Sequence, residues 1–150
     1  MLRRLHHLRS ISVREALTFI HALVVMGVVE ILVRFVRLPR VARLVGAPLS
    51  LDTTEPKPFD PAVFDNMPIA MRRKLWCTDR VAVRWPFSKG PCLRRALVGG
   101  HLIRRHGPTI RLGVDVSAAD AEAHAWLEID GEPLEDTTDI VTFTSRGDDA

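Results

Sequence analysis

The sequence predicts an α+β fold in which one helix packs on a small antiparallel sheet and further helices precede both. The helix is predicted over residues 91 to 106, because Gly90-Pro91 is a plausible helix entry and Gly107-Pro108 is a strong stop. Residues 109 to 116 then alternate between polar and apolar side chains, which is the period of a half-buried strand.

More strands are predicted after this pair of elements. A second strand over residues 123 to 129 reaches Asp130-Gly131, a common turn pair. Residues 133 to 136 and 140 to 144 then supply one or two short strands. Neighbouring strands joined by such short connections are antiparallel.

The N-terminal half is predicted to be helical. Residues 13 to 37 form one long helix that is apolar nearly all the way round, so it needs cover on several sides, from this chain, a partner protein or a membrane surface. Pro39 ends it, and Val41 to Val45 form another turn. A second amphipathic helix is predicted from Pro68 to about Val83.

Composition places two boundaries along the chain. Four of the ten prolines lie between residues 48 and 61, which indicates an extended connector. We therefore predict an N-terminal helical segment at 1–47, a candidate partner-docking region, then a proline-rich connector at 48–66 and a core domain at 67–150.

Charge and cysteine usage exclude several classes of protein. The net charge of +3 is weak evidence for an anionic partner, and no stretch interleaves basic and aromatic residues as nucleic-acid grooves do. Cys77 and Cys92 are too few for a disulfide framework or a zinc site, so we expect a reducing cytoplasm. The apolar run from Ala16 to Val29 lacks a cleavage pattern and is short for a membrane span, so a buried or partner-facing helix is favoured and membrane contact stays open.

Cys92 and His124 are the candidate catalytic pair. Cys92 falls in the first turn of its predicted helix, where unpaired backbone N–H groups and the positive end of the helix dipole stabilise a thiolate. It shares a helix face with small residues such as Ala96 and Gly99, which would let a sheet approach closely. His124 lies on the second strand, on the face that also carries Trp126, and a histidine so placed can activate a thiol.

A third group must orient the imidazole, and three acids are available: Asp130, Asp136 and Asp139. A two-residue turn at Asp130-Gly131 would place Asp136 on the face opposite His124. A three-residue loop with a glycine bulge would place it on the same face. Asp136 as the third member therefore predicts a bulged or odd-length turn.

The ordered strings CLRRALVGGHLIRRHG, IRLGV and AHAWLEIDGEPLED carry a family resemblance. Over about residues 90 to 137 the chain resembles the leader peptidase of lasso-peptide biosynthesis, a transglutaminase-like cysteine protease. The resemblance implies a transglutaminase-like or papain-like core, with Cys92 as nucleophile, His124 as general base and Asp136 as orienting carboxylate. Trp126 is expected to pack beside the site, with a lesser expectation that it lines the substrate groove.

The resemblance also implies a substrate and partners. The enzyme would cleave a ribosomally made precursor peptide between leader and core without any cofactor or metal, and an ATP-dependent cyclase would act on the product. Some relatives carry a fused leader-recognition domain, whereas this chain has only apolar helices there, which predicts a separate recognition protein. An acyltransferase with the same residues and a non-catalytic membrane or partner-binding scaffold remain the alternatives.

Overall fold

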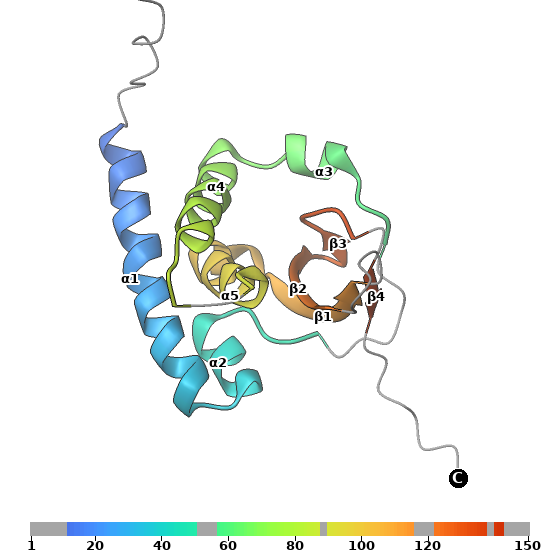
Figure 1. Ribbon diagram of the computed structural model, residues 1–150. Coiled ribbons are helices and arrows are strands. Elements are labelled where there is room, and N and C mark those ends of the chain that lie inside the picture. The colour runs from blue at the N-terminus through green and yellow to red at the C-terminus, as the bar shows by residue number, and fades with distance from the viewer. Residues whose placement is uncertain (1–11, 51–56, 88–89, 116–121, 138–139, 143–150) are drawn as a thin grey trace, which may run out of the picture.

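The computed structural model describes residues 12–50, 57–87, 90–115, 122–137 and 140–142, and it confirms the α+β prediction (Figure 1). The elements run in the order α1 (Val13–Phe35), α2 (Leu38–Val45), α3 (Pro61–Asp65), α4 (Ile69–Val83), α5 (Cys92–Ile103), a 3₁₀ turn η1 (Arg104–His106), β1 (Thr109–Asp115), β2 (Glu122–Ile129), β3 (Glu132–Pro133) and β4 (Ile140–Thr142). The four strands form one antiparallel sheet in the order β3-β2-β1-β4.

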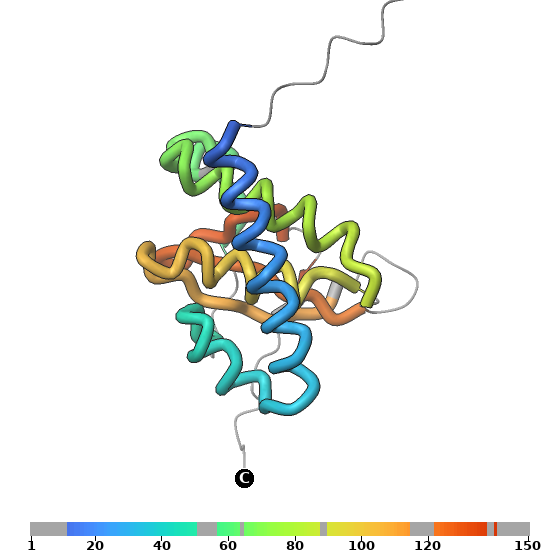
Figure 2. Tube along the Cα trace, turned by 90° about the vertical axis from the view of Figure 1, so that its left-hand side faces the viewer, coloured from blue at the N-terminus to red at the C-terminus, as the bar shows by residue number. Residues whose placement is uncertain are grey.

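Helix α5 lies at the centre of the fold, between the sheet and the N-terminal helices (Figures 1 and 2). Its glycines allow this close packing, as the small-residue face predicts. A Cβ added to Gly100 would lie 2.5 Å from the Cβ of Ala47 and 3.2 Å from Cδ2 of Leu127 on β2. A Cβ added to Gly99 would lie 3.1 Å from the other methyl group of Leu127. The two glycines therefore set how near α5 comes to the sheet.

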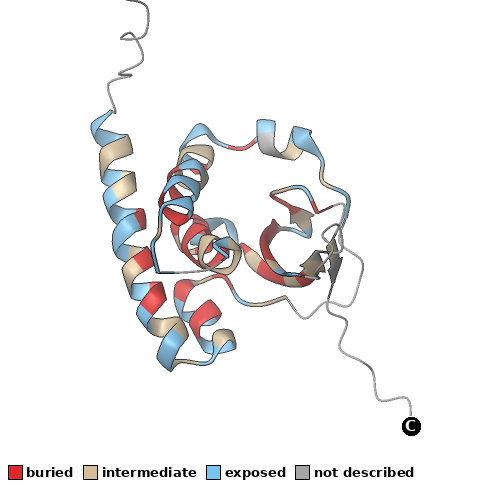
Figure 3. Cartoon of the chain, in the orientation of Figure 1, coloured by how far each residue is buried: buried red, intermediate tan, exposed pale blue. Residues whose placement is uncertain are grey.

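Helix α1 is the outermost layer and packs through one face only (Figures 2 and 3). Ser12 begins it with a capping box, in which its hydroxyl accepts from the Glu15 amide and the Glu15 carboxylate accepts from the Ser12 amide. Ala22, Met26 and Val29 on the inner face belong to the same hydrophobic core as α5 and β2. The cover predicted for this helix is thus supplied by the chain on one side.

By length and composition α1 could cross a membrane, or serve as a signal sequence, although the core helix of a soluble protein passes the same test. It is the one helix of this kind among the described residues. Its inner face packs against α4 and α5. In this structure α1 therefore packs as part of the domain through its inner face.

The structure changes the local predictions at two places and does not test them at a third. Residues 61–65 form the short helix α3 within the predicted connector, because Asp60 Oδ1 accepts from the Ala62 amide and begins a turn there. The strand predicted at 133–136 is limited to Glu132–Pro133. The final residues of the strands predicted at 109–116 and 140–144 lie outside the described residues.

Candidate active site

Cys92 is the first residue of α5, as the Gly90-Pro91 entry predicts. The Arg95 amide donates to the Pro91 carbonyl at 2.8 Å, so the amides before Arg95 precede the first hydrogen bond of the helix. The Cys92 side chain is half-buried, and its thiol donates to the Ala123 carbonyl on β2, with Sγ 3.7 Å from the oxygen. The helix start therefore delivers the thiol to the strand at the residue next to His124.

His124 lies near the start of β2, opposite Gly113 on β1. Its side chain is about one quarter exposed, so the imidazole is open to a substrate and still held by neighbours. Nε2 lies 3.9 Å from Oε1 of Glu135. The imidazole ring stacks on Trp126, with the ring centroids 6.4 Å apart and the planes inclined by 25°.

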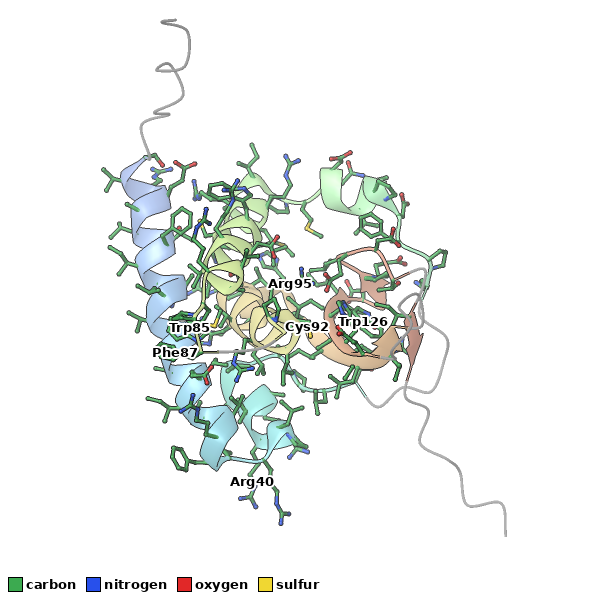
Figure 4. All side chains as sticks on the ribbon, in the orientation of Figure 1. Arg40, Trp85, Phe87, Cys92, Arg95 and Trp126 are labelled. Atoms are coloured by element: carbon green, nitrogen blue, oxygen red, sulfur yellow. The ribbon has the colours of Figure 1, made fainter. Side chains whose placement is uncertain are left out.

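Glu135 links His124 to α5. Its other carboxylate oxygen forms an ion pair with the Arg95 guanidinium, which also lies 3.6 Å from Oδ1 of Asp79 on α4. Figure 4 shows Arg95 and Cys92 together on the side of α5 that faces the sheet. Sequence reasoning missed this ion pair, because Arg95 and Glu135 lie 40 residues apart in the chain.

The turn at Asp130-Gly131 has two residues, so the predicted odd-length turn is wrong. Glu128 pairs with Pro133 and Ile129 with Glu132, and both turn residues adopt positive φ, +53° at Asp130 and +79° at Gly131. Aspartate and glycine tolerate that conformation, which suits a two-residue hairpin whose twist matches its strands.

This register does not place Asp136. The last backbone hydrogen bond of the hairpin runs from the Leu134 amide to the Leu127 carbonyl at 2.9 Å. Asp136 lies two residues further on and is exposed. The alternation of faces on which the odd-turn argument depended ends before it, so the assignment of Asp136 as the orienting carboxylate stays a prediction.

Trp126 is fully buried on the same sheet face as His124. Its indole N–H donates to Oε1 of Glu128 at 3.0 Å, and the same oxygen lies 3.3 Å from Nη1 of Arg111. The charged side chains of Arg111 and Glu128 are also buried, so this face of the sheet is covered as well. The burial favours the packing role of Trp126, as a support for the His124 ring, over the groove-lining role.

The neighbouring Arg94 points away from the sheet and binds α1. It donates through Nε to Glu30 of α1 at 2.5 Å, and Glu30 also accepts from Arg34 and from the Trp85 indole. The hydrogen bond from Arg94 holds the pKa of Glu30 below its ordinary value, and burial opposes that shift. Arg94 is thus a cation that is less than one fifth exposed and joins α5 to α1.

The second thiol and the other polar groups near α5 complete the description. Cys77 is fully buried, and burial raises the pKa of its thiol, as is typical of an unreactive structural cysteine. Within the described ranges, no three histidine, cysteine or acidic side chains gather as they would around a metal ion. A cavity of about 120 Å³ lies beside Arg95 and Glu135, lined also by Leu75, Asp79 and Leu127.

The chain was compared with known proteins at three levels. The profile of the transglutaminase-like superfamily matches residues 26–145, which includes α1 from its middle onward, Cys92, His124 and Asp136. No curated protein and no solved structure matches the chain. The match extends well beyond the residues 90 to 137 that carry the resemblance seen in the sequence.

Proposed function

Because this chain belongs to the transglutaminase-like superfamily, whose members are typically cysteine-dependent enzymes, we propose that it is a cysteine protease that removes the leader from a ribosomally made lasso-peptide precursor. The observation that carries the proposal is the position of the Cys92 thiol, at the first residue of α5 and against the β2 backbone beside His124. A nucleophile, an adjacent base and a helix N-terminus are the parts that thiol-based acyl transfer needs.

The proposed reaction has two steps. The Cys92 thiolate attacks the carbonyl carbon of the leader–core bond, the C–N bond breaks, and His124 protonates the departing amine. Water then attacks the thioester with His124 as base, the C–S bond breaks, and the leader leaves with a new carboxylate. The Cys92 amide at the helix start is the proposed oxyanion donor. Asp136 is the proposed orienting carboxylate, and Glu135 is a second carboxylate in reach of the imidazole.

The proposed setting follows the family resemblance. The enzyme works in the cytoplasm, and a separate leader-recognition protein delivers the precursor. An ATP-dependent cyclase then joins the freed core amine to an Asp or Glu side chain. Because Ala22, Met26 and Val29 belong to the core, partner docking at the N-terminal helices is better tested by surface substitutions than by deleting residues 1–47.

Incubation with a candidate precursor, with and without the recognition protein, tests the proposal. Mass spectrometry should show two fragments whose masses sum to the precursor plus one water. Cys92→Ala should abolish the cleavage, and Cys77→Ala, which changes the buried thiol, should retain it. Cleavage that survives Cys92→Ala would overturn the proposal and favour a scaffold with a contaminating protease.

An acyltransferase is the second candidate, since the superfamily includes such enzymes alongside cysteine proteases. It would form the same thioester on Cys92 and transfer the acyl group to an amine in place of water. A product heavier than the leader acid by the mass of an added amine, less one water, would favour this function over the protease.

A further inference from the structure

The outer face of α1 carries an unbroken apolar stripe. Its side chains are spaced three or four residues apart, and the spacing repeats after eleven residues. Each is between 50% and 83% exposed: Val13, Leu17, Ile20, Val24, Val28, Ile31 and Phe35. Eleven residues in three turns is close to the natural period of an α-helix, so the stripe stays on one side of the helix over about 33 Å. We call this surface the outer stripe (Figure 3).

The inner face of the same helix is fixed to the domain. Glu30 is buried and accepts hydrogen bonds from Arg94 of α5 and from the Trp85 indole. Insertion of α1 across a bilayer would strip Glu30 of these partners and place its charge in hydrocarbon, which is costly. The helix therefore stays packed on the domain with its outer stripe exposed.

The charges that border the outer stripe have one sign. Between residues 12 and 47 of the described chain, neither of the two acidic side chains is exposed, since Glu30 is buried and Glu15 is half-buried in the capping box. The exposed charged side chains in the same range are all arginines: Arg14, Arg34, Arg37, Arg40 and Arg43. An apolar surface bordered by arginines is complementary to a surface that is apolar within and negatively charged outside.

A second apolar feature adjoins the outer stripe. A groove of about 820 Å³ runs between α1 and the C-terminal end of α4, and Trp76, Trp85 and Phe87 contribute to its walls. The Arg80 guanidinium lies over the exposed Trp76 ring, 4.9 Å from its centroid. Tryptophan and arginine in this combination are enriched where proteins meet the boundary between lipid headgroups and acyl chains.

We infer that the outer stripe binds the surface of an anionic lipid bilayer, with α1 lying in the plane of the membrane. A second copy of the chain is a poor occupant, because pairing two outer stripes brings arginines from both copies together with no exposed acid between them in this range. The active site lies on the far side of α5 from α1, so membrane binding leaves it open (Figures 1 and 4).

Vesicle flotation with the full chain tests the inference. Vesicles of phosphatidylcholine with one quarter phosphatidylglycerol should bind the protein at least tenfold more tightly than phosphatidylcholine alone. The triple variant Leu17→Gln, Val24→Gln, Ile31→Gln should lose binding by more than tenfold, since it removes apolar contacts without changing charge. Arg40→Gln and Arg43→Gln should each weaken binding about fivefold and make it less sensitive to salt.

The controls separate folding and function from lipid binding. Ile69→Gln, at an exposed position on α4 outside the outer stripe, should bind as the wild type does. An unchanged melting temperature shows that each variant is folded, and Cys92→Ala, which blocks the proposed cleavage, should leave flotation unchanged. The inference is overturned if the folded wild type binds neither kind of vesicle. A dimer in light scattering that the triple variant abolishes, without vesicle binding, would assign the outer stripe to a second copy instead.

Discussion

Two adjacent arginines of α5 hold opposite sides of the molecule, and their surroundings differ. Arg94 reaches outward to the buried Glu30 of α1, where both side chains are less than one fifth exposed. Arg95 reaches toward the sheet, to Glu135 and through it to His124, where all three side chains are about one quarter to one third exposed. A rotation of about 100° along the helix thus separates a pair that holds helices together from a pair beside the candidate catalytic site.

The difference in burial predicts which property of the protein each ion pair affects. A buried ion pair that loses one partner leaves an uncompensated charge and costs stability. A half-exposed pair contributes little stability, because water screens it. Substitutions on the Glu30 side should therefore lower the free energy of unfolding, and those on the Glu135 side should slow the proposed reaction.

The largest expected effect lies beside His124. If Asp136 orients the imidazole, Asp136→Asn should lower kcat/KM by roughly 10² to 10⁴-fold, as loss of an orienting carboxylate does in related chemistry. Glu135→Gln should lower it by only about tenfold, because its Oε1 lies 3.9 Å from Nε2 of His124, beyond hydrogen-bond distance. Both variants should melt within about 2 °C of the wild type. The reverse ranking in steady-state assays would make Glu135 the orienting carboxylate.

The next effect lies on the Arg94 side. Glu30→Ala should destabilise the fold by about 3 kcal/mol, because it leaves the Arg94 guanidinium, which is less than one fifth exposed, without its main partner. The double variant Glu30→Met, Arg94→Met should recover most of that loss, since neither charge is then buried alone. Urea unfolding measures both. A double variant no more stable than Glu30→Ala would show that the pair is not what holds α1 to α5.

The packing of α5 on its neighbours supplies a matched pair of glycine substitutions. Gly100→Ala should destabilise by about 2 kcal/mol, because the new methyl group would meet the Ala47 Cβ at 2.5 Å. Gly27→Ala on α1 meets nothing within 4 Å and should stabilise by up to about 1 kcal/mol through helix propensity. Thermal unfolding of the two variants should shift in opposite directions, and equal shifts would contradict the close approach.

The smallest effect is a dependence on pH. The pKa of Glu30 is held below its ordinary value of 4.5, chiefly by the hydrogen bond from Arg94. Its contribution to stability is therefore complete above pH 4.5 and is lost as the pH falls below that value toward the folded-state pKa. The difference in melting temperature between wild type and Glu30→Gln should be constant from pH 7 to 5 and should narrow below pH 4.5. A constant difference down to pH 3 would exclude the shift.

The local parts of this fold could be predicted, because they depend on residues near one another in the chain. Gly90-Pro91 placed the start of α5 within one residue and Cys92 in its first turn. The alternation over residues 109 to 115 and 123 to 129 placed β1 and β2. The apolar residues of α1 predicted the helix. The same residue types lie on its buried and exposed faces, so only the structure shows which face is buried.

The parts that could not be predicted depend on distant partners or on near-equal alternatives. Arg94 and Arg95 look alike in sequence, and their roles differ because Glu30 and Glu135 approach from opposite sides, 64 and 40 residues away. Asp130-Gly131 is compatible with both a two-residue turn and a longer bulged loop. The odd-length turn was predicted because only that loop would place Asp136 on the face of His124. Asp136 lies past the last hydrogen bond of the hairpin, so the length of the turn does not decide which face it lies on.

The central claim is that His124 activates the Cys92 thiol. The most direct measurement is the rate at which iodoacetamide alkylates Cys92 at neutral pH, followed by peptide mass spectrometry in the wild type and in His124→Ala, with the buried Cys77 as internal reference. The account predicts rapid alkylation of Cys92 in the wild type and at least a tenfold slower rate in a folded His124→Ala variant. Equal rates in the two proteins would contradict it.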